Sequence, residues 1–167
     1  RGGASSAAAT FSLSTLSDSV RFNGAVILQS GATIDTDDLE GSESPLDNTT
    51  TLGADILFTN DASIDSFTGE TNDLTFDAGH FSVLFNEDLG ATRRLGAFTV
   101  TEADAGVTFG QADDDVDGLP LADLGQVEKF YTDGAINIGS TDITGPITLR
   151  GGASSAAATF SLSTLSD

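Results

Sequence analysis

The residues best suited to chemistry form an acidic run, Asp113-Asp114-Asp115-Val116-Asp117-Gly118. Carboxylates at alternate positions followed by glycine match the opening of calcium-binding loops, where oxygen ligands surround a hard cation and glycine permits the bend. An EF-hand is not indicated, because its twelfth position requires a bidentate glutamate and is Leu124 here. The pattern favours two interpretations: a solvated acidic turn, or a looser calcium site formed by Asp113, Asp115, Asp117 and Asp123.

Other residue types give little support for catalysis, so we expect no enzyme activity. The chain has one histidine, His80, one lysine, Lys129, and no cysteine. No serine lies in a Gly-x-Ser-x-Gly motif. His80 is predicted to be a surface residue in a turn. Lys129 with Phe130 and Tyr131 is either a small recognition patch or an ordinary strand with its polar residues outward. No cofactor other than calcium is indicated.

The charge balance limits the possible partners. Twenty-six acidic residues against six basic ones give a net charge of −20. Such a surface repels nucleic-acid phosphates and anionic membranes, whereas it favours cations. No apolar run approaches the roughly 18 residues of a membrane span, so membrane insertion is not expected.

The elements that position these residues are predicted to be short strands. Apolar residues recur two apart with a polar residue between them, which is the strand period, and Gly, Asn, Asp and Ser separate the segments. The clearest examples are Val20-Arg21-Phe22, Ile56-Leu57-Phe58, Leu74-Thr75-Phe76, Val83-Leu84-Phe85, Phe98-Thr99-Val100 and Val107-Thr108-Phe109.

The spacing of the strands favours an all-β parallel β-helix (β-solenoid). Strand starts at Val83, Val107, Val127 and Ile147 lie 24, 20 and 20 residues apart. A coil near 20 residues gives about seven coils in 149 residues, and an axial length of roughly 34 Å at one strand spacing per coil. The polar stretch 35–51 is predicted to be a loop insertion. Asp61, Asp65, Asp73 and Asp77 are expected to flank strands as turn residues, near their counterparts in stacked coils. The alternative is a string of antiparallel β-sandwich domains.

An exact internal repeat sets the domain organisation. Residues 1–18 recur letter for letter as residues 150–167, an offset of 149 residues. Residues 1–149 are therefore interpreted as one full repeat and residues 150–167 as the start of the next. The chain, which lacks an initial methionine, is expected to be a window of a longer tandem array, although non-covalent head-to-tail stacking is also possible.

Several of these segments resemble the repeats of giant filamentous-haemagglutinin-like bacterial surface proteins. Val20–Leu28 is similar to their recurrent Phe-Asn-Gly-Ala-Val strand, and the resemblance continues through Ala54–Phe58, Asn72–Gly79, Val83–Asn86 and Leu95–Val100. It implies a secreted rod-forming β-helix, located outside the cell or at its surface, that acts as an adhesin, stalk or matrix fibre. Expected partners are copies of itself and surface glycans. The alternatives are a calcium-binding β-sandwich adhesin repeat and a carbohydrate-active β-helix enzyme.

Overall fold

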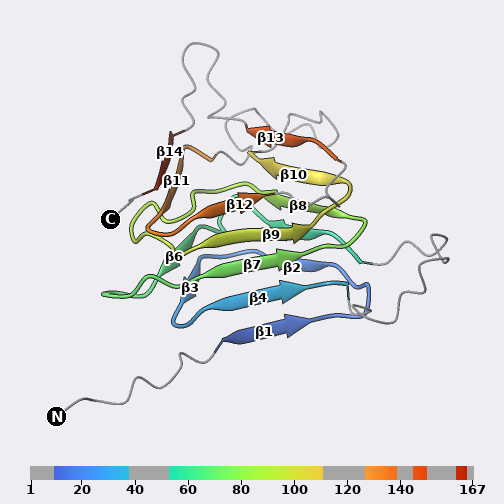
Figure 1. Ribbon diagram of the computed structural model, residues 1–167, viewed down its shortest axis with the longest axis horizontal. Helices are drawn as coiled ribbons and strands as arrows, with labels where there is room; N and C mark the ends of the chain where they lie inside the picture. Colours follow the sequence, from blue (N-terminus) through green and yellow to red (C-terminus); the bar gives the residue numbers. More distant parts are fainter. Residues whose placement is uncertain (1–9, 38–52, 111–126, 139–144, 150–160, 165–167) are drawn as a thin grey trace.

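The computed structural model describes residues 10–37, 53–110, 127–138, 145–149 and 161–164 of the chain (Figure 1). Every regular element in these residues is a β-strand. The strands are β1 (Phe11–Ser14), β2 (Val20–Phe22), β3 (Val26–Leu28), β4 (Ala32–Asp35), β5 (Ile56–Phe58), β6 (Ile64–Ser66), β7 (Leu74–Asp77), β8 (Ser82–Phe85), β9 (Phe98–Glu102), β10 (Gly106–Phe109), β11 (Lys129–Thr132), β12 (Ile136–Ile138), β13 (Ile147–Leu149) and β14 (Ser161–Thr164).

The strands form three faces. Sheet A has the order β1-β4-β7-β9-β12 and sheet B the order β2-β5-β8-β10-β13. The third face, here called sheet C, contains the pairs β3–β6 and β11–β14, and Leu89 joins them by bridging Ile64 and Phe130. Along the chain the strands visit the faces in the order A, B, C and then A again. Figure 1 shows the rows stacked from β1 at one end to β13 at the other.

Every strand pairing among the described residues is parallel. The prediction of an all-β chain with parallel strands is therefore confirmed. The β-sandwich alternative is wrong for these residues, because it requires antiparallel neighbours. No helix is present in the described part of the chain, and hence none there is long and apolar enough to cross a membrane.

The number of rows differs from the sequence prediction of seven coils. Within the ranges that the structure describes, sheets A and B each contain five strands. Val83, Val107 and Ile147 do pair in sheet B, as their spacing indicated, but Val127 does not belong to that row. The next strand after it, β11, begins at Lys129 and lies in sheet C. Forty residues of chain fit either one long coil or two coils of 20 residues. Val107 and Ile147 are paired in the neighbouring strands β10 and β13, so a single coil separates them.

The interior is a stack of phenylalanine rings. Phe22, Phe58, Phe85 and Phe109 occupy equivalent positions on sheet B, because each is paired in register with the next. Their ring centroids lie 4.6, 5.2 and 5.1 Å apart, and the planes are within 18° of parallel. Phe130 continues the stack at 5.1 Å from Phe109. The strand spacing thus places aromatic faces in contact, and each row covers the apolar face of the one before.

One further prediction falls at the edge of the described residues. Asp35, the first residue of the predicted insertion 35–51, is the last residue of β4. Residues 38–51 lie outside the described part.

Close backbone approach explains the glycine at position 90. Gly90 has φ 67°, and a Cβ there would overlap the carbonyl oxygen of Tyr131 in the next row.

Candidate metal centre

The predicted calcium ligands Asp113, Asp115, Asp117 and Asp123 all lie outside the described residues. Within the described residues, a different acidic cluster forms where sheet A turns into sheet B. It contains two groups that share Glu102: His80, Glu102 and Asp104, and Asp37, Asp77 and Glu102. In each group the potential ligand atoms all lie within 4.8 Å of one another. The acidic residues of this corner could therefore hold a metal ion.

Parallel strand register creates the cluster. The carboxyl ends of β4, β7 and β9 meet at one edge of sheet A, where Asp35 is paired with Asp77 and Asp77 with Glu102. A register shift between Phe76 and Asp77 adds one residue to β9 at this point. The backbone continues the ladder around the corner, since Ala78 N donates to Glu102 O at 2.9 Å. Carboxylates that are distant in sequence are thereby stacked one strand spacing apart.

Asp77 is the buried member of the cluster, with 6% of its surface exposed. Its Oδ2 accepts a hydrogen bond from Thr101 Oγ1 at 2.7 Å, and its Oδ1 accepts one from Gly79 N at 3.2 Å. Two donors compensate for the loss of water around this charge. A carboxylate has further lone pairs available, so these bonds do not prevent Asp77 from ligating a cation.

Asp37 supplies a carboxylate oxygen that is still available. Its backbone N donates to Asp35 Oδ1 at 2.8 Å, which folds residue 37 back over the end of β4. Asp37 Oδ1 is shielded from solvent and has no hydrogen-bond partner among the described residues. A buried carboxylate oxygen without a donor is costly unless a cation or a proton satisfies it.

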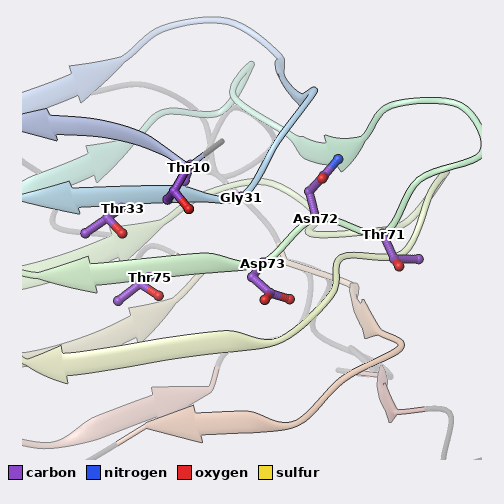
Figure 2. Close-up of a pocket in the computed structure, with 8 residues that line it drawn as sticks. Thr10, Gly31, Thr33, Thr71, Asn72, Asp73 and Thr75 are labelled. Atoms are coloured by element: carbon purple, nitrogen blue, oxygen red, sulfur yellow. The ribbon is translucent and has the colours of Figure 1, made fainter. Parts of the chain in front are cut away.

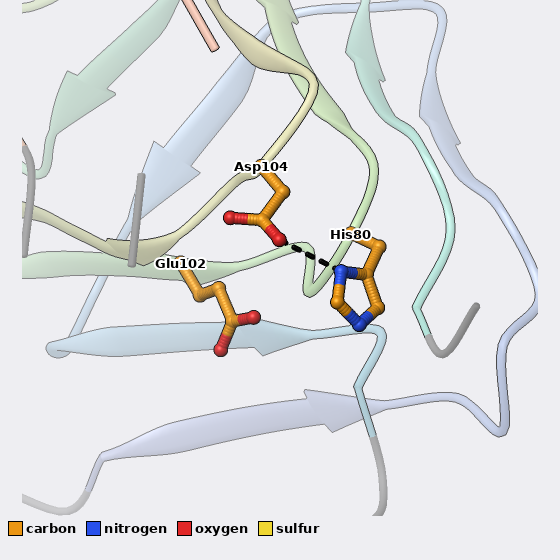
Figure 3. Close-up of side chains that lie close together, drawn as sticks. All are labelled: His80, Glu102 and Asp104. Carbon is orange, nitrogen blue, oxygen red and sulfur yellow. Dashed lines mark hydrogen bonds and ion pairs between the residues drawn. The ribbon is translucent and has the colours of Figure 1, made fainter. Parts of the chain in front are cut away.

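His80 and Asp104 form the outer side of the cluster (Figure 3). His80 Nδ1 lies 2.7 Å from Asp104 Oδ2, and the two side chains are 40% and 23% exposed. His80 is therefore at the surface, as the sequence predicted, but it has an acidic partner. Figure 3 shows Glu102, the last residue of β9, beside this pair and two residues before Asp104.

Glu102 has the most altered acidity in the corner. Burial, and then the negative charges of Asp77, Asp104 and Asp37, together raise the pKa of its carboxyl from 4.5 to about 7, while His80 opposes them. Neighbouring anions repel the charged form of a carboxyl group, and a cation bound beside it offsets this repulsion. The charge pattern of the corner therefore favours a positive ligand.

The donor atoms indicate which cations are suitable. The group formed by Asp37, Asp77 and Glu102 offers only oxygen, which suits hard cations such as Ca²⁺ and Mg²⁺. Two oxygens bound to one Ca²⁺ lie at most about 5 Å apart, because each Ca–O distance is about 2.3–2.6 Å. The 4.8 Å limit is within that range. The second group adds an imidazole nitrogen, which suits transition metals better.

Sequence reasoning did not find this cluster. The chain pattern placed Asp37 in a solvated loop, Asp77 in a turn and His80 in isolation, and it gave no role to Glu102 or Asp104. Period-two alternation predicts which residues share a strand, but not which strands become neighbours. The available signal was an acidic residue within two positions after each of three apolar strand segments: Asp35, Asp77 and Glu102.

Carboxylates at other corners have a different role. Asp65 Oδ1 accepts hydrogen bonds from Thr92 N at 3.0 Å and Arg93 N at 2.8 Å, both in the next coil. Asp88 Oδ1 accepts from Glu128 N at 2.7 Å and Lys129 N at 2.8 Å in the same way. These carboxylates bond the turns of consecutive rows to each other. Asp65 and Asp77 moreover lie within strands, although the sequence placed both in turns.

Of the residues considered as a recognition patch, Lys129 and Tyr131 face outward from β11, whereas Phe130 faces the interior. Phe130 is 1% exposed and belongs to the interior stack. Lys129 Nζ lies 3.8 Å from Asp88 Oδ2, and the Tyr131 ring lies under the Arg94 guanidinium at 5.1 Å. The interpretation as an ordinary strand is therefore correct.

A polar hollow of about 380 Å³ lies on the outside of sheet A (Figure 2). Thr33 of β4 and Thr75 of β7 are paired in register and present neighbouring hydroxyls there. Asp73 at its rim is engaged, because its Oδ1 accepts a hydrogen bond from Ala97 N at 2.7 Å. The hollow is lined by Thr10, Gly31, Ala32, Thr33, Thr71, Asn72, Asp73 and Thr75.

No family model, curated protein or solved structure matches this chain.

Proposed function

We propose that this chain is a structural repeat of an extracellular filament or giant adhesin, in which parallel coils stack into a stiff acidic rod. The chain winds as a parallel β-helix, one face after another. Its role is mechanical: projection from a cell surface, adhesion, or assembly of a matrix fibre. No catalytic step is assigned to it.

The observation that carries this proposal is the continuity of the stack up to its ends. Interior residues such as Phe58, Phe85 and Phe109 are 1% exposed or less. The outermost rows repeat the same pattern, but their apolar residues are open: Phe11 of β1 is 57% exposed, and Leu149 of β13 is 54% exposed. Exposed apolar edges of this kind are stable when another row covers them. A molecule with such ends is suited to extension.

Cation binding is the second part of the proposal. The cluster around Glu102 concentrates negative charge at one corner of every repeat, and a divalent ion there would join β4, β7 and β9. Ca²⁺ is the cation that an all-oxygen donor set outside the cell would favour. A cation that binds only the folded state would raise the free energy of unfolding by RT ln(1 + [L]/Kd), where [L] is the concentration of free cation.

The location and partners follow from the resemblance to filamentous-haemagglutinin-like repeats and remain part of the proposal. The partners are copies of the same repeat, and surface glycans contacting the threonine-lined hollow on sheet A. Hydroxyl-rich surfaces suit polyhydroxylated ligands, since both sides donate and accept hydrogen bonds.

Electron microscopy of polypeptides with one, two and three tandem copies tests the rod. We expect particles of constant width whose length increases by the same increment with each copy. Thermal unfolding in Ca²⁺ and in chelator tests the cation, with a higher midpoint expected in Ca²⁺. Separate globules joined like beads would reject the rod, and equal midpoints would reject the cation.

A further inference from the structure

The two copies of the repeated segment lie on different faces of the molecule. Residues Phe11–Ser14 form β1, which pairs with β4 in sheet A. The counterparts of Ser12–Ser14 in the second copy are Ser161–Ser163, which belong to β14 (Ser161–Thr164), and β14 pairs with β11 in sheet C. Because the two segments have the same sequence, local residue preferences cannot cause the difference. The length of chain between the copies determines it.

The order of the strands explains this change of face. The chain visits sheets A, B and C in turn, and in the part that the structure describes one passage through sheet C, at Leu89, forms isolated bridges in place of a strand. When this position is included, β14 is the fourteenth strand position after β1. Fourteen is not a multiple of three, so a further 149 residues do not bring the chain back to sheet A.

We propose that the exposed edges of β12, β13 and β14 are the docking surface for the next copy of this repeat, which arrives rotated by one face. This inference rests on the proposed function, because it requires repeats that stack. Successive repeats then differ by about 120° around the rod axis, and every third repeat has the same orientation. Features that occur once per repeat, such as the acidic corner, occupy all three sides of the rod.

The apolar residues of the two ends match in this rotated arrangement. The strand after β14 enters sheet A, so Val20 and Phe22 of the next copy lie over Ile136 and Ile138 of β12. The following strand places Val26 and Leu28 of that copy over Ile147 and Leu149 of β13. Ile147 is 48% exposed and Leu149 54% exposed without this covering row. The next copy thus removes apolar surface from water at both edges.

Arg94 of the first copy holds the first strand of the second. Its Nη1 donates to Thr132 O at 3.0 Å and to Ser163 O at 3.2 Å, and its Nη2 donates to Ser163 Oγ at 3.4 Å. The guanidinium also lies 5.1 Å from the centroid of the Tyr131 ring and 3.7 Å from Asp133. One side chain therefore joins β11 to β14, and this contact exists only when the second copy begins on sheet C.

Disulfide trapping in the 167-residue chain tests the inference, since the chain has no cysteine of its own. Ser161 is the ladder partner of Lys129, so Lys129→Cys with Ser161→Cys should crosslink under mild oxidation. Without rotation, β14 would lie on β12 as β1 lies on β4, and Ser161 would be beside Asn137. Adjacent strands bring Cα atoms within the range that a disulfide requires. Asn137→Cys with Ser161→Cys is therefore the matched control.

We expect the first pair to close within single chains and the second to remain open, as read by non-reducing gels and peptide mass spectrometry at low protein concentration. Closure of the second pair instead would reject the rotation while leaving the rod intact. Failure of both pairs would also overturn the inference, and imaging of tandem copies would then decide whether the rod fails with it.

Arginine variants give an independent measurement. Arg94→Ala should lower the crosslinking rate of the Lys129→Cys, Ser161→Cys chain several-fold, because β14 loses the hydrogen bonds that Arg94 donates to Ser163. Arg93→Ala removes the same charge from an exposed neighbour and should leave the rate unchanged. Equal rates in both variants would contradict the role of Arg94.

Discussion

Glu102 is the residue through which pH should act on this fold. Burial and the neighbouring carboxylates raise the pKa of its carboxyl from an ordinary 4.5 to about 7 in the folded chain. Between pH 4.5 and about pH 7 the folded state binds more protons than the unfolded state, so the free energy of unfolding falls as pH rises. We expect a higher thermal midpoint at pH 5 than at pH 8 from this residue. Glu102→Gln should flatten the change over this range, as followed by circular dichroism.

Two comparisons separate this effect from a general loss of negative charge. Glu70→Gln alters an exposed glutamate and should keep the pH dependence of the original chain. Added Ca²⁺ at pH 8 should raise the midpoint of the original chain more than that of Glu102→Gln, because a cation replaces the proton among Asp37, Asp77 and Glu102. A pH slope that survives in Glu102→Gln would show that another group controls it.

Asp65 represents the carboxylates that bond consecutive rows. Asp65→Ala removes the acceptor for two backbone N–H groups, those of Thr92 and Arg93. We expect it to lower the free energy of unfolding by about 1–2 kcal/mol, the usual effect of losing such bonds. Asp65→Asn keeps an acceptor oxygen and should lose less than half of that, measured by urea denaturation. Equal losses in the two variants would indicate that the charge, and not the acceptor, is what matters.

At the scale of the elements, the stacked phenylalanines should contribute most to stability. Phe85 is fully buried and lies between Phe58 and Phe109, at 5.2 and 5.1 Å. Phe85→Ala should cost about 3–5 kcal/mol, because it removes contacts on both sides and leaves a cavity. Phe67, which is 45% exposed, provides the comparison.

Phe67→Ala should change the free energy of unfolding by no more than about 0.5 kcal/mol, as surface substitutions usually do. Equilibrium urea unfolding of both variants gives the comparison. If the two substitutions cost the same, the ring stack is not what holds the rows together.

The strands themselves were largely predictable, and the site was not. Val83-Leu84-Phe85 and Phe98-Thr99-Val100 are strands in the structure because alternation forces one apolar face inward, and that is a local property. The row containing Val127 was predicted wrongly, since spacing alone does not show on which face a strand lies. The acidic corner depends on the register between β4, β7 and β9. Period-two alternation does not determine the register between strands that are distant in sequence.

At the scale of the whole molecule, charge and stacking oppose each other. A net charge of −20 on 167 residues favours solubility and repels neighbouring rods, while open apolar edges favour extension along one axis. Under the proposed function, this combination predicts growth end to end with little lateral aggregation. Divalent cations at the corners would weaken the repulsion and allow rods to associate side by side.

The axial rise of one repeat tests the account most directly. In the described part of the chain, β14 follows β1 by fourteen strand positions on three faces, which gives four and two-thirds coils per 149 residues and a rise of about 22 Å at 4.8 Å per coil. Helical reconstruction or fibre diffraction of a multi-repeat polypeptide should show the 4.8 Å spacing along the axis, a rise near 22 Å per repeat, and the same orientation at every third repeat. A rise above about 50 Å, as sandwich domains in tandem would give, or a 4.8 Å spacing across the axis, would contradict it.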